Sequence, residues 1–159
     1  IMAYTDYEFY KSKFYGDTVP ESDFLKYAER ASDRIDQYTF DRLVDGLPEN
    51  ERAKTKVQKA VCAVVDEMYK VDQARNAIMD NIGTIQREDG TVVNKTVSSI
   101  SSGNESISYA TGSNAFANNK YVELATNPKK ESEHYLQKAV EYLFNTTDDN
   151  GIHLLYAGL

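Results

Sequence analysis

Few side chains in the sequence could take part in catalysis or metal binding, and His134 has the best setting. It ends the segment Glu131-Ser132-Glu133-His134, whose spacing places Glu131 and His134 on one face of a helix, as in di-iron carboxylate bundles. Such a centre needs two of these motifs and two further carboxylates, and the chain contains the motif once. We therefore expect His134 to be a solvated or interface histidine without a metal role.

A second candidate, the segment Asp148-Asp149-Asn150-Gly151, is similar to the middle of a calcium-binding loop. If Gly151 takes the sixth position of such a loop, Thr146 takes the first and Ala157 the last, where a bidentate glutamate is required. A plain turn is therefore predicted. His153 has no cysteine or serine partner in a recognisable motif, so we expect it to pack beside Leu154 and not to act as a base.

The remaining charged side chains are predicted to lie on solvated helix faces. Asp33 and Asp36 could form a carboxylate pair, but Arg30 and Arg34 beside them indicate ordinary surface ion pairs. Residues 46–80 hold six basic and six acidic side chains and are neutral as a whole, which favours a solvated face over a basic patch. The basic side chains gathered at the start of this segment are Arg52, Lys54, Lys56 and Lys59.

The composition predicts one soluble globular domain spanning residues 1–159, with no enzymatic function and no cofactor. The formal charge of -7 opposes a firm grip on nucleic acid, and no apolar run approaches the ~20 residues needed to cross a membrane. No signal peptide can be recognised at the start. The single cysteine, Cys62, lies in an apolar run, so a buried and inert thiol in a reducing compartment is expected.

Apolar periodicity predicts a mainly α fold, a small bundle of three main helices with a short C-terminal segment. The helices are expected at about 18–45, 48–82 and 127–145. The first starts at a capping-box spacing from Thr18 to Glu21, and the third at Asn127-Pro128. The predicted core positions are Phe24, Tyr27, Ala28, Ala31, Ile35 and Tyr38, then Val57, Val61, Val64, Val65, Met68, Val71 and Ile78, then Leu136, Ala139, Val140, Leu143 and Phe144.

Two segments differ from the helices. Between about 92 and 112, β-branched residues alternate with serine and threonine, which predicts a long β-hairpin or an extended arm between the second and third helices. Its edge either pairs with a partner or is satisfied within a small two-stranded sheet folded over the helices. At the C-terminus, residues 152–159 form an apolar tail that is expected to need a partner.

The order of these features resembles the head-tail connector proteins of long-tailed bacteriophages of Gram-positive hosts. The resemblance spans nearly the whole chain and depends on order and spacing, not on reactive groups. It is carried by the segments Tyr4 to Tyr10, Tyr15-Gly16, Pro20 to Phe24, Ala28 to Ser32, Ile35 to Thr39, Val61 to Val64, Ser108-Tyr109-Ala110 and Leu154 to Gly158.

The resemblance implies a virion protein of the phage neck, assembled in the host cytoplasm. It would dock as a ring of twelve copies under the portal protein after DNA packaging, extend the DNA channel and carry the stopper or tail-completion protein. An acidic ring would let DNA pass without specific binding. The expected interface residues, for strand addition by the arm and for contact of the tail with portal or neighbour, are Ile100, Ile107, Tyr109, Ile152, Leu154, Leu155 and Tyr156.

Two other functions compete with this interpretation. A stopper or tail terminator would belong to the same phage neck, but we expect such proteins to be richer in strands. A helical DNA-binding regulator would need a basic recognition face, which the charge of -7 does not provide.

Overall fold

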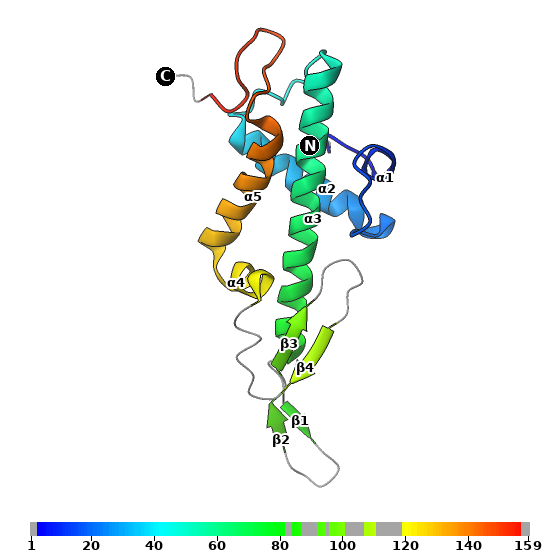
Figure 1. The fold of residues 1–159 in the computed structure, drawn as a ribbon, viewed down its shortest axis with the longest axis vertical. Coiled ribbons are helices and arrows are strands. Elements are labelled where there is room, and N and C mark those ends of the chain that lie inside the picture. The colour runs from blue at the N-terminus through cyan, green and yellow to red at the C-terminus, as the bar shows by residue number, and fades with distance from the viewer. Residues whose placement is uncertain are drawn as a thin grey trace. The chain divides into compact units, whose positions relative to one another are not determined.

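The computed structural model describes residues 3–81, 84–86, 92–94, 96–100, 107–110 and 119–156, and its fold is mainly helical, as predicted (Figure 1). The helices are α1 (Tyr7–Ser12), α2 (Glu21–Tyr38), α3 (Glu51–Asn81), α4 (Lys120–Thr126) and α5 (Pro128–Leu143). The strands are β1 (Thr84–Gln86), β2 (Val92–Asn94), β3 (Thr96–Ile100) and β4 (Ile107–Ala110).

The chain divides into two compact units, and the division falls within α3 and within α5. The first unit contains Ile1–Tyr69 and Glu133–Leu159, and the second contains Lys70–Ser132. The expectation of a single domain stays a prediction.

The core of the first unit is formed by apolar stripes on α2 and on the first half of α3. Both stripes follow the predicted helical spacing, and burial of each such side chain stabilises the fold by about 1.5–3 kcal/mol. Of the predicted positions in this unit, Tyr38 is half-buried. The fully or nearly fully buried ones are Phe24, Tyr27, Ala28, Ala31, Ile35, Val57, Val61, Val64, Val65 and Met68. Two predicted positions on α3 belong to the second unit, where Val71 is fully buried and Ile78 is half-buried.

The ends of α2 differ from the prediction of 18–45. The helix stops at Tyr38 because Phe40 and Asp41 adopt left-handed backbone conformations, with φ of 55° and 60°. At its start the capping-box prediction was wrong. Pro20 is the N-cap and makes no side-chain hydrogen bond, while the Thr18 N–H donates to the Tyr10 hydroxyl at 3.0 Å.

The sequence pattern also placed the start of α3 too early. The helix begins at Glu51, after Asn50, whose side-chain oxygen accepts hydrogen bonds from the backbone N–H groups of Arg52 and Ala53 at 3.0 and 3.1 Å. Asn50 therefore caps the helix, in the role that asparagine favours.

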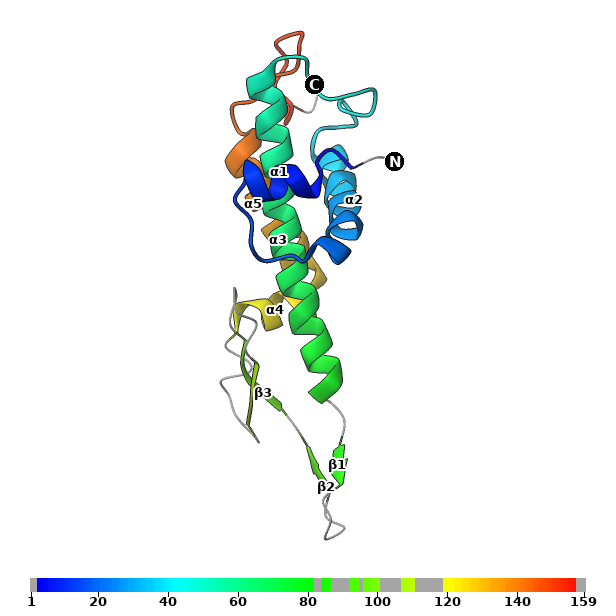
Figure 2. The same cartoon turned by 90° about the vertical axis from the view of Figure 1, so that its right-hand side faces the viewer.

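Helix α1 was not predicted, and it carries the central aromatic side chain of the first unit. Asp6 caps it by accepting from the Phe9 N–H at 2.8 Å, and α1 lies against α2 (Figure 2). The Tyr10 ring is fully buried, with its centroid 4.9 Å from that of Phe24. Its hydroxyl donates to Asp66 at 2.6 Å and accepts from the N–H groups of Thr18 and Val19.

Helix α5 begins where predicted, because Asn127 caps it by accepting from the Lys130 N–H at 3.2 Å. Two predicted core residues are wrong: Leu136 is exposed, and Phe144, which follows the helix, is 76% exposed. The buried face is rotated toward His134, Tyr135, Ala139 and Leu143, and Val140 is half-buried.

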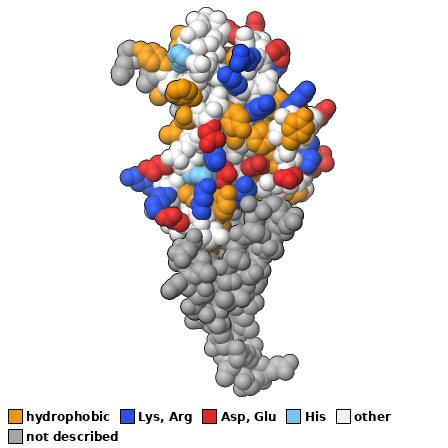
Figure 3. Space-filling model, in the orientation of Figure 1, with side chains coloured by type: hydrophobic (Ala, Val, Ile, Leu, Met, Phe, Trp, Pro, Cys, Tyr) orange, Lys and Arg blue, Asp and Glu red, His pale blue; other side chains and the backbone are white. Residues whose placement is uncertain are grey.

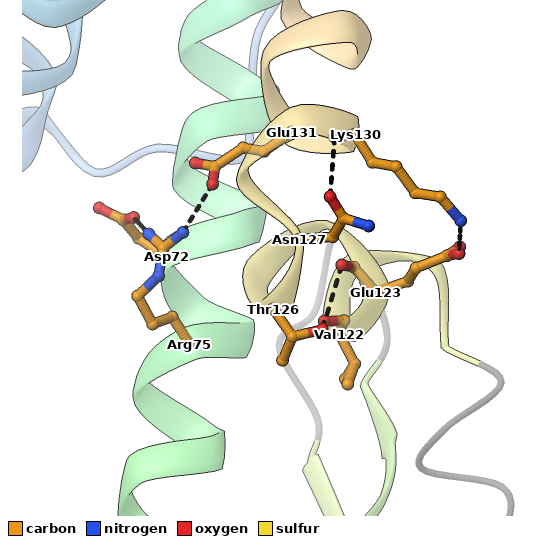
Figure 4. A network of polar contacts seen from close by, with 8 residues as sticks. All are labelled: Asp72, Arg75, Val122, Glu123, Thr126, Asn127, Lys130 and Glu131. Carbon is orange, nitrogen blue, oxygen red and sulfur yellow. Dashed lines mark hydrogen bonds and ion pairs between the residues drawn. The ribbon is translucent and has the colours of Figure 1, made fainter.

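In the second unit, polar contacts join α3 to the first turn of α5, and the first turn of α5 to α4 (Figure 4). Arg75 pairs with Asp72 at 2.7 Å and with Glu131 at 2.8 Å, and Lys130 pairs with Glu123. These side chains are partly exposed, so each pair is worth about 0–1 kcal/mol.

The strands of the second unit form two antiparallel pairs, β1 with β2 and β3 with β4. The register of β3 and β4 shifts between Val97 and Ser99, as at a β-bulge. The predicted arm at 92–112 covers three of these strands, but residues 95, 101–106 and 111–112 lie outside the described part. The arm as one projecting hairpin therefore stays a prediction.

Candidate docking surface

The loop between α2 and α3, residues 39–50, meets the C-terminal tail at one end of the first unit (Figure 1). Two successive residues in this loop, Phe40 and Asp41, hold a positive φ, which costs about 1–3 kcal/mol each. Hydrogen bonds from the Asp41 N–H to Asp36 O and from the Arg42 N–H to Thr39 O fix the conformation. The strained backbone leaves the Phe40 side chain 53% exposed.

Arg42 ties the loop to the tail. Its Nη1 donates hydrogen bonds to the carbonyl oxygens of His153 and Leu154, both at 3.0 Å. The guanidinium also lies 5.7 Å from the ring centroid of Phe40 and 5.9 Å from that of Tyr156, which is the range of cation–π attraction. We call these five residues the Arg42 clamp.

Residues 152–156 of the tail are folded back on the first unit, which corrects the expectation of a free apolar segment. Leu154 is fully buried, and its N–H donates to Thr146 O at 3.0 Å, beside an antiparallel bridge between Thr147 and His153. Leu154 therefore belongs to the core and is not available to a partner. His153 is exposed, so the prediction that its side chain packs beside Leu154 was wrong.

The other three residues of the tail that were predicted to form an interface remain at the surface. Tyr156 is 50% exposed, Ile152 is also exposed, and Leu155 is half-buried. The sequence had pointed to all three as interface residues, but it missed Phe40 and Arg42. One feature of the sequence could have indicated them: if the apolar stripe of α2 continued past Tyr38, the charged Arg42 would lie in the core.

The predicted plain turn at 148–151 is confirmed. The Asp148 carboxylate accepts from the N–H groups of Asn150 and Ile152, both at 2.9 Å, which is typical of an Asx turn. Asp149 accepts from the N–H groups of Glu49 at 3.0 Å and Asn50 at 3.4 Å, so a carboxylate sits at the positive end of α3.

A small pocket of about 390 Å³ lies beside this turn. It is lined mainly by polar groups from the start of α3 and from residues 145–149, including Arg52 and Lys56. Of the basic side chains predicted to lie on a solvated face of α3, Arg52 is exposed and the three lysines are half-buried.

A second and larger hollow, of about 860 Å³, lies along the α2–α3 loop, and we call it the acidic groove. Three carboxylates, from Asp36, Asp41 and Asp45, line it together with Ala3, Tyr4, Leu43, Val44, Gly46 and Leu47.

Asp36 in this groove is buried and accepts a hydrogen bond from the Tyr4 hydroxyl, which corrects the expectation of a surface ion pair. Burial raises the pKa of Asp36, and the nearby charges of Asp41 and Asp33 raise it further, while the Tyr4 hydrogen bond lowers it. The neighbouring Arg34 lies over the Tyr135 ring, 5.7 Å from its centroid.

His134 is buried and not solvated, contrary to the prediction. One ring nitrogen, Nε2, lies 2.9 Å from a carboxylate oxygen of Glu67, which is also buried, so this pair joins α3 to α5 inside the first unit. Within the described ranges, no group of three His, Cys, Asp or Glu side chains is placed to hold a metal ion.

Cys62 is fully buried, as predicted. Burial raises the pKa of its thiol to about 12.

The arm residues Ile100, Ile107 and Tyr109 lie in β3 and β4, where Ile100 is paired with Ile107 and Tyr109 with Val97. Their side chains lie outside the described part of the chain, so their interface role stays a prediction.

Among the helices that the structure describes, none combines the length and apolarity needed to cross a bilayer. Comparison of the chain with profiles of known protein families, with curated proteins and with solved structures found no match.

Proposed function

We propose that this protein is a structural subunit of a phage neck, a head-tail connector that docks as a ring of copies under the portal protein. The observation that carries the proposal is the Arg42 clamp, which holds exposed aromatic side chains in a fixed arrangement at the surface. The rings of Phe40 and Tyr156 both lie within 6 Å of the Arg42 guanidinium, and Ile152 is exposed on the same tail. Aromatic residues and arginine dominate the binding energy of protein interfaces, so this composition favours a protein partner.

Rigidity of the clamp supports the same proposal. Two hydrogen bonds from Arg42 fix the tail backbone, and Leu154 anchors the tail in the core. A partner would therefore bind a surface that already has its bound conformation, and less conformational entropy would be lost on association. In the proposed assembly the partner of this surface is the portal or the adjacent copy.

The charge of the chain is compatible with a DNA channel. A formal charge of -7 per copy, repeated around a ring of twelve, would repel phosphates and allow the genome to slide. On the face shown in Figure 3 the charged side chains of both signs are interspersed, so the proposal requires acidic residues to prevail at the lumen. A ring with a basic lumen would contradict it.

The finer parts of the proposal concern the arm and the upper partner. Ile100, Ile107 and Tyr109 would dock by strand addition, since β3 and β4 form a two-stranded pair in the part of the chain that the structure describes. The stopper or tail-completion protein would bind the opposite side of the ring. The protein would work in the virion neck after assembly in the host cytoplasm.

The experiment is co-sedimentation of the purified protein with DNA-filled capsids that carry their portal. We expect binding of about a dozen copies per capsid, the ring size that the resemblance to head-tail connectors implies. Tyr156→Ala should lower the bound amount by about tenfold or more, as expected for an aromatic interface anchor. Leu25→Ala is the matched control, because Leu25 is an exposed apolar residue on α2 outside the clamp.

Two results would count against the connector function. No binding to portal-bearing capsids, together with a stable small dimer in solution, would favour an unrelated helical domain or the regulator. Binding only to capsids that already carry a connector would favour the stopper.

A further inference from the structure

The acidic groove has charges that the described chain leaves without a counter-ion. Asp41 and Asp45 are exposed, and no lysine or arginine of the described residues pairs with either of them. Between these carboxylates lie apolar side chains, among which Val44 is strongly exposed. The groove therefore combines negative charge with apolar surface, which is complementary to an aromatic side chain flanked by lysines.

A segment with that chemistry lies elsewhere on the first unit. The end of α1 and the turn after it, residues 11–15, carry the exposed cations Lys11 and Lys13 and the side chain of Tyr15. Tyr15 is 81% exposed and holds a left-handed backbone, with φ of 59°. We call this segment the Lys–Tyr loop.

The exposure of Tyr15 has a structural cause. The Gly16 N–H donates to Tyr10 O at 2.8 Å, and the Phe14 N–H donates to Phe9 O at 3.1 Å, so the turn is fixed at both sides of Tyr15. An aromatic residue kept in a strained conformation and turned to solvent is costly for a monomer. Glu8 and Asp17 flank the loop and offset the charge of its two lysines. In a contact with a partner, Tyr15 would therefore supply the binding energy as the anchor, and the lysines would orient the loop.

We propose that the Lys–Tyr loop of one copy docks in the acidic groove of a second copy, with Tyr15 against Val44 and the lysines facing Asp41 and Asp45. The two surfaces differ, so the contact is head-to-tail and repeats from copy to copy, which gives a ring when the rotation closes. This inference rests on the proposed function, because it names the contact between neighbouring copies in the proposed ring.

The first experiment is disulfide trapping between two single variants, Tyr15→Cys and Val44→Cys. Background reaction is low because the only native cysteine, Cys62, is fully buried. One variant carries a mass tag, and the two are mixed under a mild oxidant, both free in solution and bound to portal-bearing capsids. We expect a mixed dimer to be the main product. Tyr15→Cys mixed with Lys129→Cys, an exposed site on α5, should give about tenfold less.

Charge exchange tests the partner assignment. Variant one carries Lys11→Glu and Lys13→Glu, and variant two carries Asp41→Lys and Asp45→Lys. In each alone, like charges would meet at every contact, so the trapped dimer should fall by about tenfold or more. Mixed together, the two variants restore opposite charges at every contact, and the yield should return.

The outcomes separate this contact from the connector function. Trapping that is no stronger than with Lys129→Cys, both in solution and on capsids, would overturn the contact, and so would charge exchange without effect. If capsids still bind about a dozen copies in that case, the connector function stands and its copies meet through other surfaces. If trapping succeeds but capsids bind nothing, the contact stands and the connector function fails.

Discussion

Replacement of Arg42 by alanine tests whether the tail is held by the clamp. The Arg42 side chain makes two hydrogen bonds of 3.0 Å to tail carbonyls, and its guanidinium lies within 6 Å of two aromatic ring centroids. Partly exposed hydrogen bonds of this kind contribute about 0.5–1 kcal/mol each, and exposed cation–π contacts about 0.5 kcal/mol each. The tail should therefore open more easily by about 2–3 kcal/mol, or roughly 30- to 150-fold in its opening equilibrium.

Hydrogen exchange reports this equilibrium directly. The amides of Leu154 and Tyr156 donate to Thr146 O and His153 O, so both should exchange faster in Arg42→Ala by the same factor. Amides in the middle of α3, such as that of Val64, should keep their rates, because the opening is local. Arg42→Lys keeps the charge but loses the planar stacking and should fall between the two.

Arg52→Ala is the matched control, because it removes an exposed arginine from the neighbouring first turn of α3. If tail amides exchange at the same rate in Arg42→Ala as in the unsubstituted protein, the buried Leu154 side chain and the backbone contacts to Thr146 and Thr147 hold the tail, and Arg42 has no energetic role. Equal acceleration in both variants would show a general effect of charge instead.

Three further predictions concern groups buried inside the first unit. A methyl group at Gly16 would lie 2.1 Å from ring atoms of Tyr10, so Gly16→Ala should lower the free energy of unfolding by about 3 kcal/mol or more, as measured by thermal unfolding. Gly46→Ala is the control: the added methyl group would meet open space, and the backbone φ of 140° should cost about 1 kcal/mol. The raised pKa of Asp36 means that the folded state binds its proton more tightly than the unfolded state, so the free energy of unfolding should fall as pH rises above the ordinary value of 3.8. Asp36→Asn should flatten that decline in urea titrations at stepped pH, and an unchanged decline would contradict the assignment. With a pKa of about 12, Cys62 has about a thousandfold less thiolate at pH 8 than an ordinary cysteine of pKa 9.0. An aromatic disulfide reagent should therefore react with Cys62 only after the protein unfolds. Rapid reaction of the folded protein would contradict the burial of Cys62.

Local pattern determined the helical class and much of the core from the sequence alone. The spacing of Val57, Val61 and Val64 predicts one buried face of a helix whatever the helix packs against, and α3 has that face. Asn127 and the turn at 148–151 were also predictable, because both use hydrogen bonds between a side chain and a backbone N–H within four residues.

Tertiary structure decided the features whose partners lie far along the chain. Tyr10 is central because Asp66 accepts its hydrogen bond, 56 residues away, and His134 is buried because Glu67 meets it 67 residues away. Leu154 is a core residue and not a docking residue, and its carbonyl oxygen accepts a hydrogen bond from Arg42, 112 residues earlier. Sequence periodicity indicates which face of a helix or strand is apolar, but it does not indicate which distant group forms a hydrogen bond with a given polar atom. Those long-range hydrogen bonds determined the buried polar pairs and the candidate docking surface.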